Sequence, residues 1–147
     1  MKLVVLTALV SLGIATAAQA AAPSTHAGVG VRSSQYGKIL FTSGGRALYV
    51  FEGDKGKTSH CYGACAKSWP PLLTKGAAMA EKGVDHMLLG TTMRKDGTDQ
   101  VTYKGHPLYT YSGDAVGKAG CQHINAFGAL WLVIEPNGTV NMSAHKA

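Results

Sequence analysis

The sequence of this 147-residue chain contains an internal repeat. Shifting the chain by 60 residues aligns residues 26–66 with residues 86–126 without a gap, and eleven of the 41 aligned positions are identical. The identical pairs are His26/His86, Gly30/Gly90, Gly37/Gly97, Thr42/Thr102, Gly45/Gly105, Leu48/Leu108, Tyr49/Tyr109, Gly53/Gly113, Asp54/Asp114, Cys61/Cys121 and Ala66/Ala126. Such a period is typical of duplicated supersecondary structure. The sequence therefore predicts two copies of one unit, at about residues 26–85 and 86–145.

Each copy has the pattern of a β-hairpin. Short runs rich in β-branched and aromatic residues flank glycine-containing turns, as is usual in hairpins. The expected strands are Gly28–Ser33, Lys38–Thr42 and Ala47–Phe51 in the first copy, and Leu88–Met93, Gln100–Tyr103 and Pro107–Tyr111 in the second. The glycines of Ser43–Gly45 and of Lys104–Gly105 supply the turns between the paired runs.

The remaining segments complete a mainly β fold. Only Ala64–Ser68 and Ala77–Lys82 are predicted as short helical turns, and the chain closes with a strand at Leu130–Ile134, which contains Trp131, and a further strand at Thr139–Met142. Neither copy alone is expected to bury its own apolar face. We therefore expect two tandem antiparallel hairpin repeats of about 60 residues, packed into a single domain over residues 21–147.

The N-terminus predicts export. A lysine at position 2 is followed by the uncharged, apolar run Leu3–Ala18, and Ala18–Ala20 has the form of a signal-peptidase site. Residues 1–20 are therefore interpreted as a signal peptide, too short for a transmembrane span. The mature protein is expected in the periplasm or outside the cell. It is not expected to be lipid-anchored, because no cysteine lies near the cleavage point.

The charge of the chain argues against nucleic-acid binding. The net charge is +6, but the basic residues are scattered and are not interleaved with aromatic residues. Attraction to an anionic cell envelope and a merely solvated surface both fit this distribution.

Three cysteines leave several chemistries open. Covalent haem attachment requires Cys-x-x-Cys-His, whereas Cys61 and Cys65 are separated by three residues and His60 precedes them. A thioredoxin-type redox pair is equally disfavoured by the spacing. One disulfide among Cys61, Cys65 and Cys121, with one spare thiol, is the expected arrangement for an exported protein.

A metal site is the alternative to the disulfide. Zinc or copper could be held by Cys61, Cys65, Cys121, His60 and His123, and haem bound without covalent attachment also stays open. A pseudo-twofold packing of the copies could bring the equivalent Cys61 and Cys121 together. Met79, Met87 and Met93, near His86, are expected to fill the core rather than to bind a metal.

A Tyr-x-aromatic-x-x-Asp motif occurs once in each copy. Cys61–Cys65 and the sequence Trp69-Pro70-Pro71 follow its first occurrence. The motif residues are Tyr49, Phe51 and Asp54, and Tyr109, Tyr111 and Asp114. In this combination the chain resembles the bacterial secreted-repeat family of predicted lipoproteins that carry this motif. The resemblance implies an exported envelope protein whose biochemical role is not established.

The motif has a structural and a binding interpretation. Residues two apart on a strand share a face, so Tyr49 and Phe51 can pack together, with Asp54 accepting backbone hydrogen bonds in the following turn. The alternative is an aromatic platform with an acid at its rim, suited to a flat or cationic ligand. We expect the structural role.

Two functional hypotheses follow from these features. The first is a non-catalytic binding module for an unidentified envelope partner or small ligand. The second is a small metal-handling, redox or haem-binding protein that uses the cysteine and histidine residues. Catalysis is not expected, since no phosphate loop, nucleophile elbow or metalloprotease helix is present in the sequence.

Overall fold

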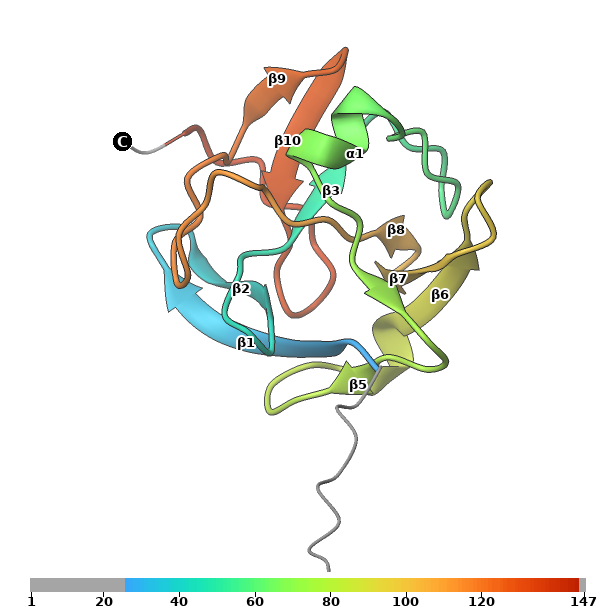
Figure 1. Cartoon of the computed structure of the whole chain (residues 1–147). Helices are drawn as coiled ribbons and strands as arrows, with labels where there is room; N and C mark the ends of the chain where they lie inside the picture. The colour runs from blue at the N-terminus through green and yellow to red at the C-terminus, as the bar shows by residue number, and fades with distance from the viewer. Residues whose placement is uncertain (1–25, 146–147) are drawn as a thin grey trace, which may run out of the picture.

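The computed structural model describes residues 26–145, and it is mainly β, as predicted. The predicted signal peptide lies outside these residues. Several small sheets are arranged around a common centre (Figure 1). The elements are β1 (Gly28–Ser34), β2 (Gly37–Thr42), β3 (Tyr49–Phe51), α1 (Ala64–Ser68), β4 (Leu73–Thr74), β5 (Met79–Ala80), η1 (His86–Leu88), β6 (Leu89–Met93), β7 (Asp99–Tyr103), β8 (His106–Pro107), β9 (Ile124–Ala126) and β10 (Ala129–Val133).

The longest hairpin of each copy joins the first two strands of that copy. In the first copy β1 pairs antiparallel with β2, and in the second copy β6 pairs antiparallel with β7. The equivalent glycines Gly37 and Gly97 both have a positive φ, of 87° and 82°, at the turns of these hairpins. The repeat in the sequence therefore corresponds to a repeat in the structure.

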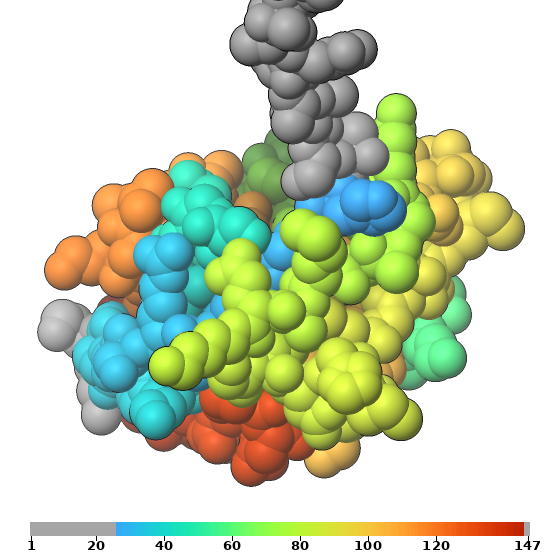
Figure 2. Space-filling view, turned by 90° about the horizontal axis from the view of Figure 1, so that it is seen from below, coloured from blue at the N-terminus to red at the C-terminus, as the bar shows by residue number. Residues whose placement is uncertain are grey.

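One predicted helical turn is wrong. The segment Ala77–Lys82 contains the strand β5, which adds to β1 in parallel. The backbone N–H groups of Met79 and Glu81 donate to the carbonyls of Ala27 and Val29, both at 2.8 Å. Pairing with an open strand edge outweighs the helix propensity of this segment. In Figure 2 the yellow-green atoms of the segment lie beside the blue and cyan atoms of β1 and β2.

The predicted hairpin around Ser43–Gly45 closes only at its beginning. Phe41 bridges Ala47, and the Leu48 N–H donates to the Leu40 carbonyl at 3.0 Å. The chain then leaves β2, and β3 pairs antiparallel with β10 of the second copy. In the second copy β7 pairs with β8 over two residues before the chain departs in the same way.

The two copies meet at the centre of the molecule. The N–H of Tyr49 donates to the carbonyl of Tyr109 at 2.8 Å, and the N–H of Tyr109 donates back to the carbonyl of Tyr49 at 2.9 Å. Because these are equivalent residues, this reciprocal pair marks a pseudo-twofold axis. The sheet β3-β10-β9 extends the contact between the copies, with Phe51 opposite Trp131.

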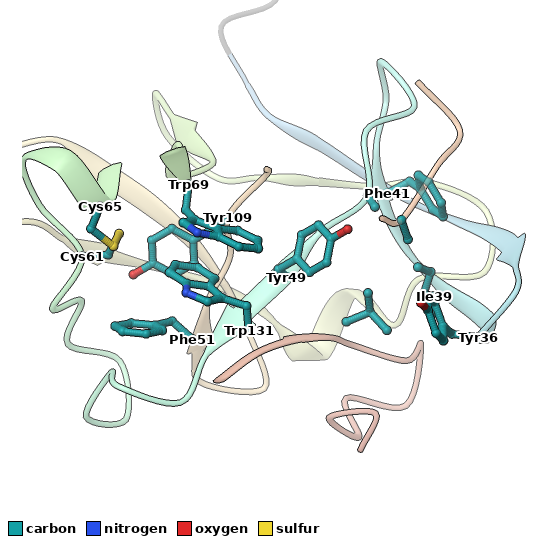
Figure 3. Packing of buried hydrophobic residues seen from close by; sticks show 13 residues of the cluster. Tyr36, Ile39, Phe41, Tyr49, Phe51, Cys61, Cys65, Trp69, Tyr109 and Trp131 are labelled. Carbon is teal, nitrogen blue, oxygen red and sulfur yellow. A yellow bond between two sulfur atoms is a disulfide. The ribbon is translucent and has the colours of Figure 1, made fainter. Parts of the chain in front are cut away.

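Two clusters of buried side chains form the core. One is aromatic and includes Trp69, Trp131 and the cysteines 61 and 65 (Figure 3), and the other is largely aliphatic and includes Leu48, Leu108 and Leu132. Both clusters draw residues from the two copies, so neither copy buries its apolar face alone. Over residues 26–145, the longest helix is much too short to cross a membrane.

Candidate functional site

The tyrosine of each motif binds the aspartate of the other copy. The Tyr49 hydroxyl donates to Asp114 Oδ2 at 2.5 Å, and the Tyr109 hydroxyl donates to Asp54 Oδ2 at 2.8 Å. Both tyrosines are fully buried. We call these two hydrogen bonds, Tyr49–Asp114 and Tyr109–Asp54, the exchanged pair, because each joins a tyrosine of one copy to the aspartate of the other.

Each aspartate also organises the loop that follows it. Asp54 Oδ1 accepts a hydrogen bond from the His60 N–H at 2.8 Å, and Asp114 Oδ1 accepts one from the Gly120 N–H at 3.0 Å. In both copies the donor lies six residues after the aspartate. The carboxylates thus hold the two loops that lead to Cys61 and Cys121.

Burial sets the protonation of this centre. Loss of solvation raises the pKa of the Tyr49 and Tyr109 hydroxyls well above the ordinary value of a tyrosine, and their hydrogen-bonded carboxylates add to this effect. Burial also raises the pKa of Asp54, although hydrogen bonds from the His60 N–H and the Tyr109 hydroxyl oppose the shift. The tyrosines therefore remain hydrogen-bond donors at pH values at which an exposed tyrosine ionises.

A column of four packed rings, from Phe51, Trp131, Trp69 and Tyr111, follows the same symmetry. Trp69 and Trp131 stack with their ring centroids 3.9 Å apart and their planes 5° from parallel. Phe51 covers the outer face of Trp131 at 4.4 Å, and its equivalent Tyr111 covers Trp69 at 4.6 Å. Figure 3 shows Tyr49 and Tyr109 beside the tryptophan pair, where each meets one indole edge-on at 5.2 Å.

This packing assigns the aromatic residues to the core. Trp69 and Trp131 are 2% and 0% exposed, and each indole face is covered by another ring. The repeated glycines contribute as well, since a Cβ at Gly53 would collide with the ring of Phe51, and one at Gly113 with the ring of Tyr111. The geometry matches the structural interpretation of the motif, and the indole faces are not available as a ligand platform.

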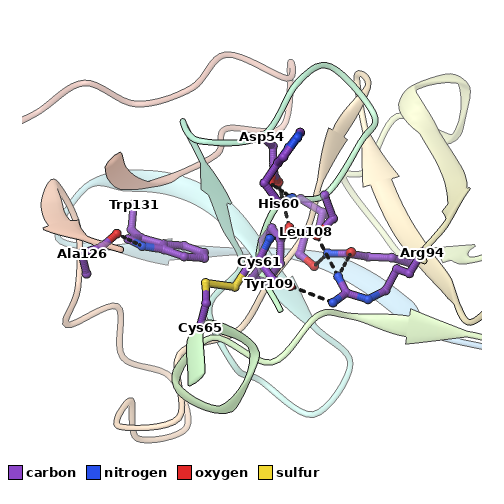
Figure 4. The surroundings of a disulfide bond; sticks show 11 residues. Asp54, His60, Cys61, Cys65, Arg94, Leu108, Tyr109, Ala126 and Trp131 are labelled. Carbon is purple, nitrogen blue, oxygen red and sulfur yellow. Dashed lines mark hydrogen bonds between the residues drawn. A yellow bond between two sulfur atoms is a disulfide. The ribbon is translucent and has the colours of Figure 1, made fainter. Parts of the chain in front are cut away.

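Cys61 and Cys65 form a disulfide beside this column. Their Cα atoms are 5.2 Å apart, and Cys61 is fully buried. The sequence left open which cysteines would pair, and the structure pairs the two that flank the start of α1 (Figure 4).

Arg94 supports the loop that carries the disulfide, a role that sequence reasoning missed. This arginine is only 5% exposed. Its Nη2 donates to the Cys61 carbonyl at 2.7 Å, and its Nη1 donates to Ser59 Oγ at 2.9 Å and to Gln100 Oε1 at 2.7 Å (Figure 4). In the sequence Arg94 is one of many scattered basic residues, and no local pattern distinguishes it.

Cys121 keeps a free thiol within the described part of the chain, and this thiol is half-buried. Burial and the nearby Asp114 carboxylate raise the pKa of the thiol, while a hydrogen bond with Tyr111 lowers it by less. Because the thiolate is the reactive form, this environment disfavours nucleophilic or redox chemistry at neutral pH.

The five predicted metal ligands are not brought together. Two of them, Cys61 and Cys65, are joined in the disulfide, and the His60 Nδ1 atom faces the Thr58 carbonyl at 3.1 Å. His123 lies in a turn at φ 57°. Across residues 26–145, no group of three histidine, cysteine, aspartate or glutamate side chains is placed to hold a metal ion.

The expected burial of the methionines is wrong. Met79 is 47% exposed, and Met87 and Met93 are each 76% exposed. They lie on β5, on η1 and at the end of β6, which form the rim of the molecule rather than its centre. The apolar residues of β1, β2 and β7 fill the adjoining core instead.

Comparison with known proteins agrees with the internal repeat. A family model described as a secreted repeat of unknown function matches residues 30–73 and again residues 90–135. These two segments contain both Tyr-x-aromatic-x-x-Asp motifs and most of both hairpins, since each match begins within the first strand of its hairpin. No curated protein and no solved structure matches the chain.

Proposed function

Because this chain belongs to the family of secreted repeats of unknown function, we propose that it acts as a non-catalytic binding module of the cell envelope. The motif tyrosines Tyr49 and Tyr109 are buried and hydrogen-bonded to the motif aspartates, so the proposed binding surface is sought among the exposed loops and strand edges. The proposal puts the protein in the periplasm or outside the cell, in line with the description of the family as secreted.

An open hollow beside β4 carries the proposal. It has a volume of about 640 Å³, and Leu73 at its wall is 44% exposed although it lies in a strand. Its lining residues are Leu73, Thr74, Lys75, Gly76, Gly97, Thr98 and Asp99. This volume falls within the range of small-ligand sites. Leu73 supplies one exposed apolar contact there, and the other lining residues are polar, charged or glycine.

The backbone of β4 suggests what enters the hollow. The Val101 N–H donates to the Leu72 carbonyl at 2.8 Å, and the Leu72 N–H donates to the Leu108 carbonyl at 2.9 Å. Thr74 lies opposite Asp99, so the alternation of an antiparallel ladder turns its backbone groups toward β7 as well. The N–H and carbonyl of Leu73 consequently point away from β7. An extended peptide could pair with this edge while placing one apolar side chain against Leu73. We propose such a peptide segment as the ligand.

A displayed library of random peptides tests this proposal. Peptides selected for binding to the mature protein should change the NMR chemical shifts of the backbone amides of Leu73, Lys75 and Gly97 when they are titrated into it. The Leu73→Glu variant should lose about tenfold or more in affinity for them.

The matched control is Val116→Glu, which places the same charge on a 65% exposed valine of another loop and should bind as the parent protein does. Selected peptides that bind both variants equally well would refute the proposed site.

A further inference from the structure

A second, smaller hollow lies on a different part of the surface, between the β1–β2 hairpin and the segment that follows β5. Its volume is about 290 Å³. Three of its six lining residues are cationic, namely Arg32, Lys38 and Lys82. The other lining residues are Val31, Ser33 and Gly83. Figure 2 shows the face on which these segments adjoin.

The register of the hairpin determines which groups face this hollow together. Ser33 lies directly opposite Lys38, so their side chains share one face of the sheet. On the neighbouring segment, the Cα of Gly83 packs so closely on Val31 that a Cβ there would lie 3.2 Å from the Val31 Cβ. Lys82 is thereby held next to the hairpin, and Lys38 and Lys82 are both exposed.

Carboxylates do not neutralise these lysines. Glu81, the neighbour of Lys82, is hydrogen-bonded to the Ser43 hydroxyl and lies against Gly28 and Gly30, on the alternate residues of β1. Within residues 26–145, the single ion pair is that of Arg94 with Asp96. The ammonium groups of Lys38 and Lys82 therefore have no carboxylate partner in the described chain.

The third cation adds charge but is held in place by other groups. The Arg32 guanidinium donates to the Ser43 carbonyl at 3.3 Å and lies over the Phe41 ring at 5.7 Å. Its charge makes the electrostatic potential in the hollow more positive, although the guanidinium itself lies over the Phe41 ring.

We propose that this hollow binds a phosphate group of a soluble phosphate polymer. Lysine ammonium groups bind phosphate as point charges, and a serine hydroxyl can donate to a phosphate oxygen. The volume suits one phosphate unit rather than a large organic ligand. Repetition of that unit along a polymer would let successive groups exchange in one site. The net positive charge of residues 21–147, which hold all the charged residues of the chain except Lys2, would attract such a polymer.

Linear polyphosphate of defined length is the probe, titrated into the mature protein by calorimetry at several salt concentrations. We expect binding that weakens with salt and that shifts the backbone amides of Ser33 and Gly83 in NMR spectra. The double variant Lys38→Gln/Lys82→Gln should lose about tenfold or more in affinity.

Lys55→Gln/Lys57→Gln is the matched control, because it removes the same charge from an exposed turn elsewhere. This variant should lose less than about twofold. Equal losses in the two variants would show unspecific attraction and overturn the proposal, as would amide shifts confined to other surfaces. Binding to vesicles of anionic phospholipid without binding to polyphosphate would also overturn it.

Discussion

Two buried tyrosine hydroxyls link the two copies of the repeat, in addition to the backbone hydrogen bonds between the copies. Tyr49 and Tyr109 each place a buried hydroxyl against a carboxylate that lies 65 and 55 residues away in the chain. Removing such a hydroxyl leaves a buried carboxylate oxygen without its donor, which is more costly than the loss of an exposed hydrogen bond.

Tyr49→Phe should therefore destabilise the protein by about 1–3 kcal/mol in denaturant unfolding. Tyr111→Phe is the control, because its hydroxyl is hydrogen-bonded to the Cys121 thiol rather than to a carboxylate, and because the first copy already has a phenylalanine, Phe51, at the equivalent position. We expect the control to cost less than about 0.5 kcal/mol. Similar losses in both variants would contradict the role assigned to the exchanged pair.

At the level of secondary structure, the sequence predicted most elements but fewer of their partners. Both copies, the strands β1, β2, β3, β6, β7 and β10 and the short helix α1 follow from periodicity and turn residues. Of the expected strand Pro107–Tyr111 only Pro107 lies in a strand, and the expected strand Thr139–Met142 is reduced to a bridge between Ile134 and Val140. The pairing of β3 with β10 does not, because alternation shows that a segment is a strand without showing which strand lies beside it.

The prediction of the site was limited in the same way, because the sequence does not show which distant segments lie beside each other. Tyr49 and Asp54 are close in sequence and suggest a local unit, whereas their partners belong to the other copy. Likewise, cysteine spacing allowed both a short bridge and a bridge to Cys121, and only the tertiary structure distinguishes them. The buried Arg94 could not be found, since its partners are a backbone carbonyl and two side chains from separate segments.

The disulfide makes a modest contribution to stability. It bridges residues four apart, so it removes little entropy from the unfolded chain, and the loop-closure relation gives about 2 kcal/mol. The double variant Cys61→Ala/Cys65→Ala should lose about this amount in denaturant unfolding and should still fold, because the Arg94 hydrogen bonds hold the same loop. A variant that fails to fold would show that the bridge, rather than Arg94, organises the loop.

The whole molecule should be sensitive to alkaline pH. The folded-state pKa of Tyr49 and of Tyr109 is raised by burial, whereas the unfolded tyrosines ionise near 10. Above that pH the unfolded chain binds fewer protons than the folded one, so the free energy of unfolding falls as pH rises.

We expect that, in a pH titration, at least two of the six tyrosines ionise only as the fold is lost. Tyrosinate absorbance and far-ultraviolet circular dichroism, followed together, measure this coupling. Ionisation of all six tyrosines with an unchanged circular dichroism spectrum would argue against it.

The exchanged tyrosine–aspartate pairs also bear on how such a protein can change during evolution. Each copy supplies the tyrosine of one hydrogen bond and the aspartate of the other. Replacing one copy with that of a related protein would therefore pair tyrosines and aspartates that had evolved in different proteins. The unit that can be inherited or recombined intact is then the duplicated pair, and the two copies are constrained to diverge together. Differences between them, such as Phe51 against Tyr111, mark the positions at which one copy could change without a matching change in the other.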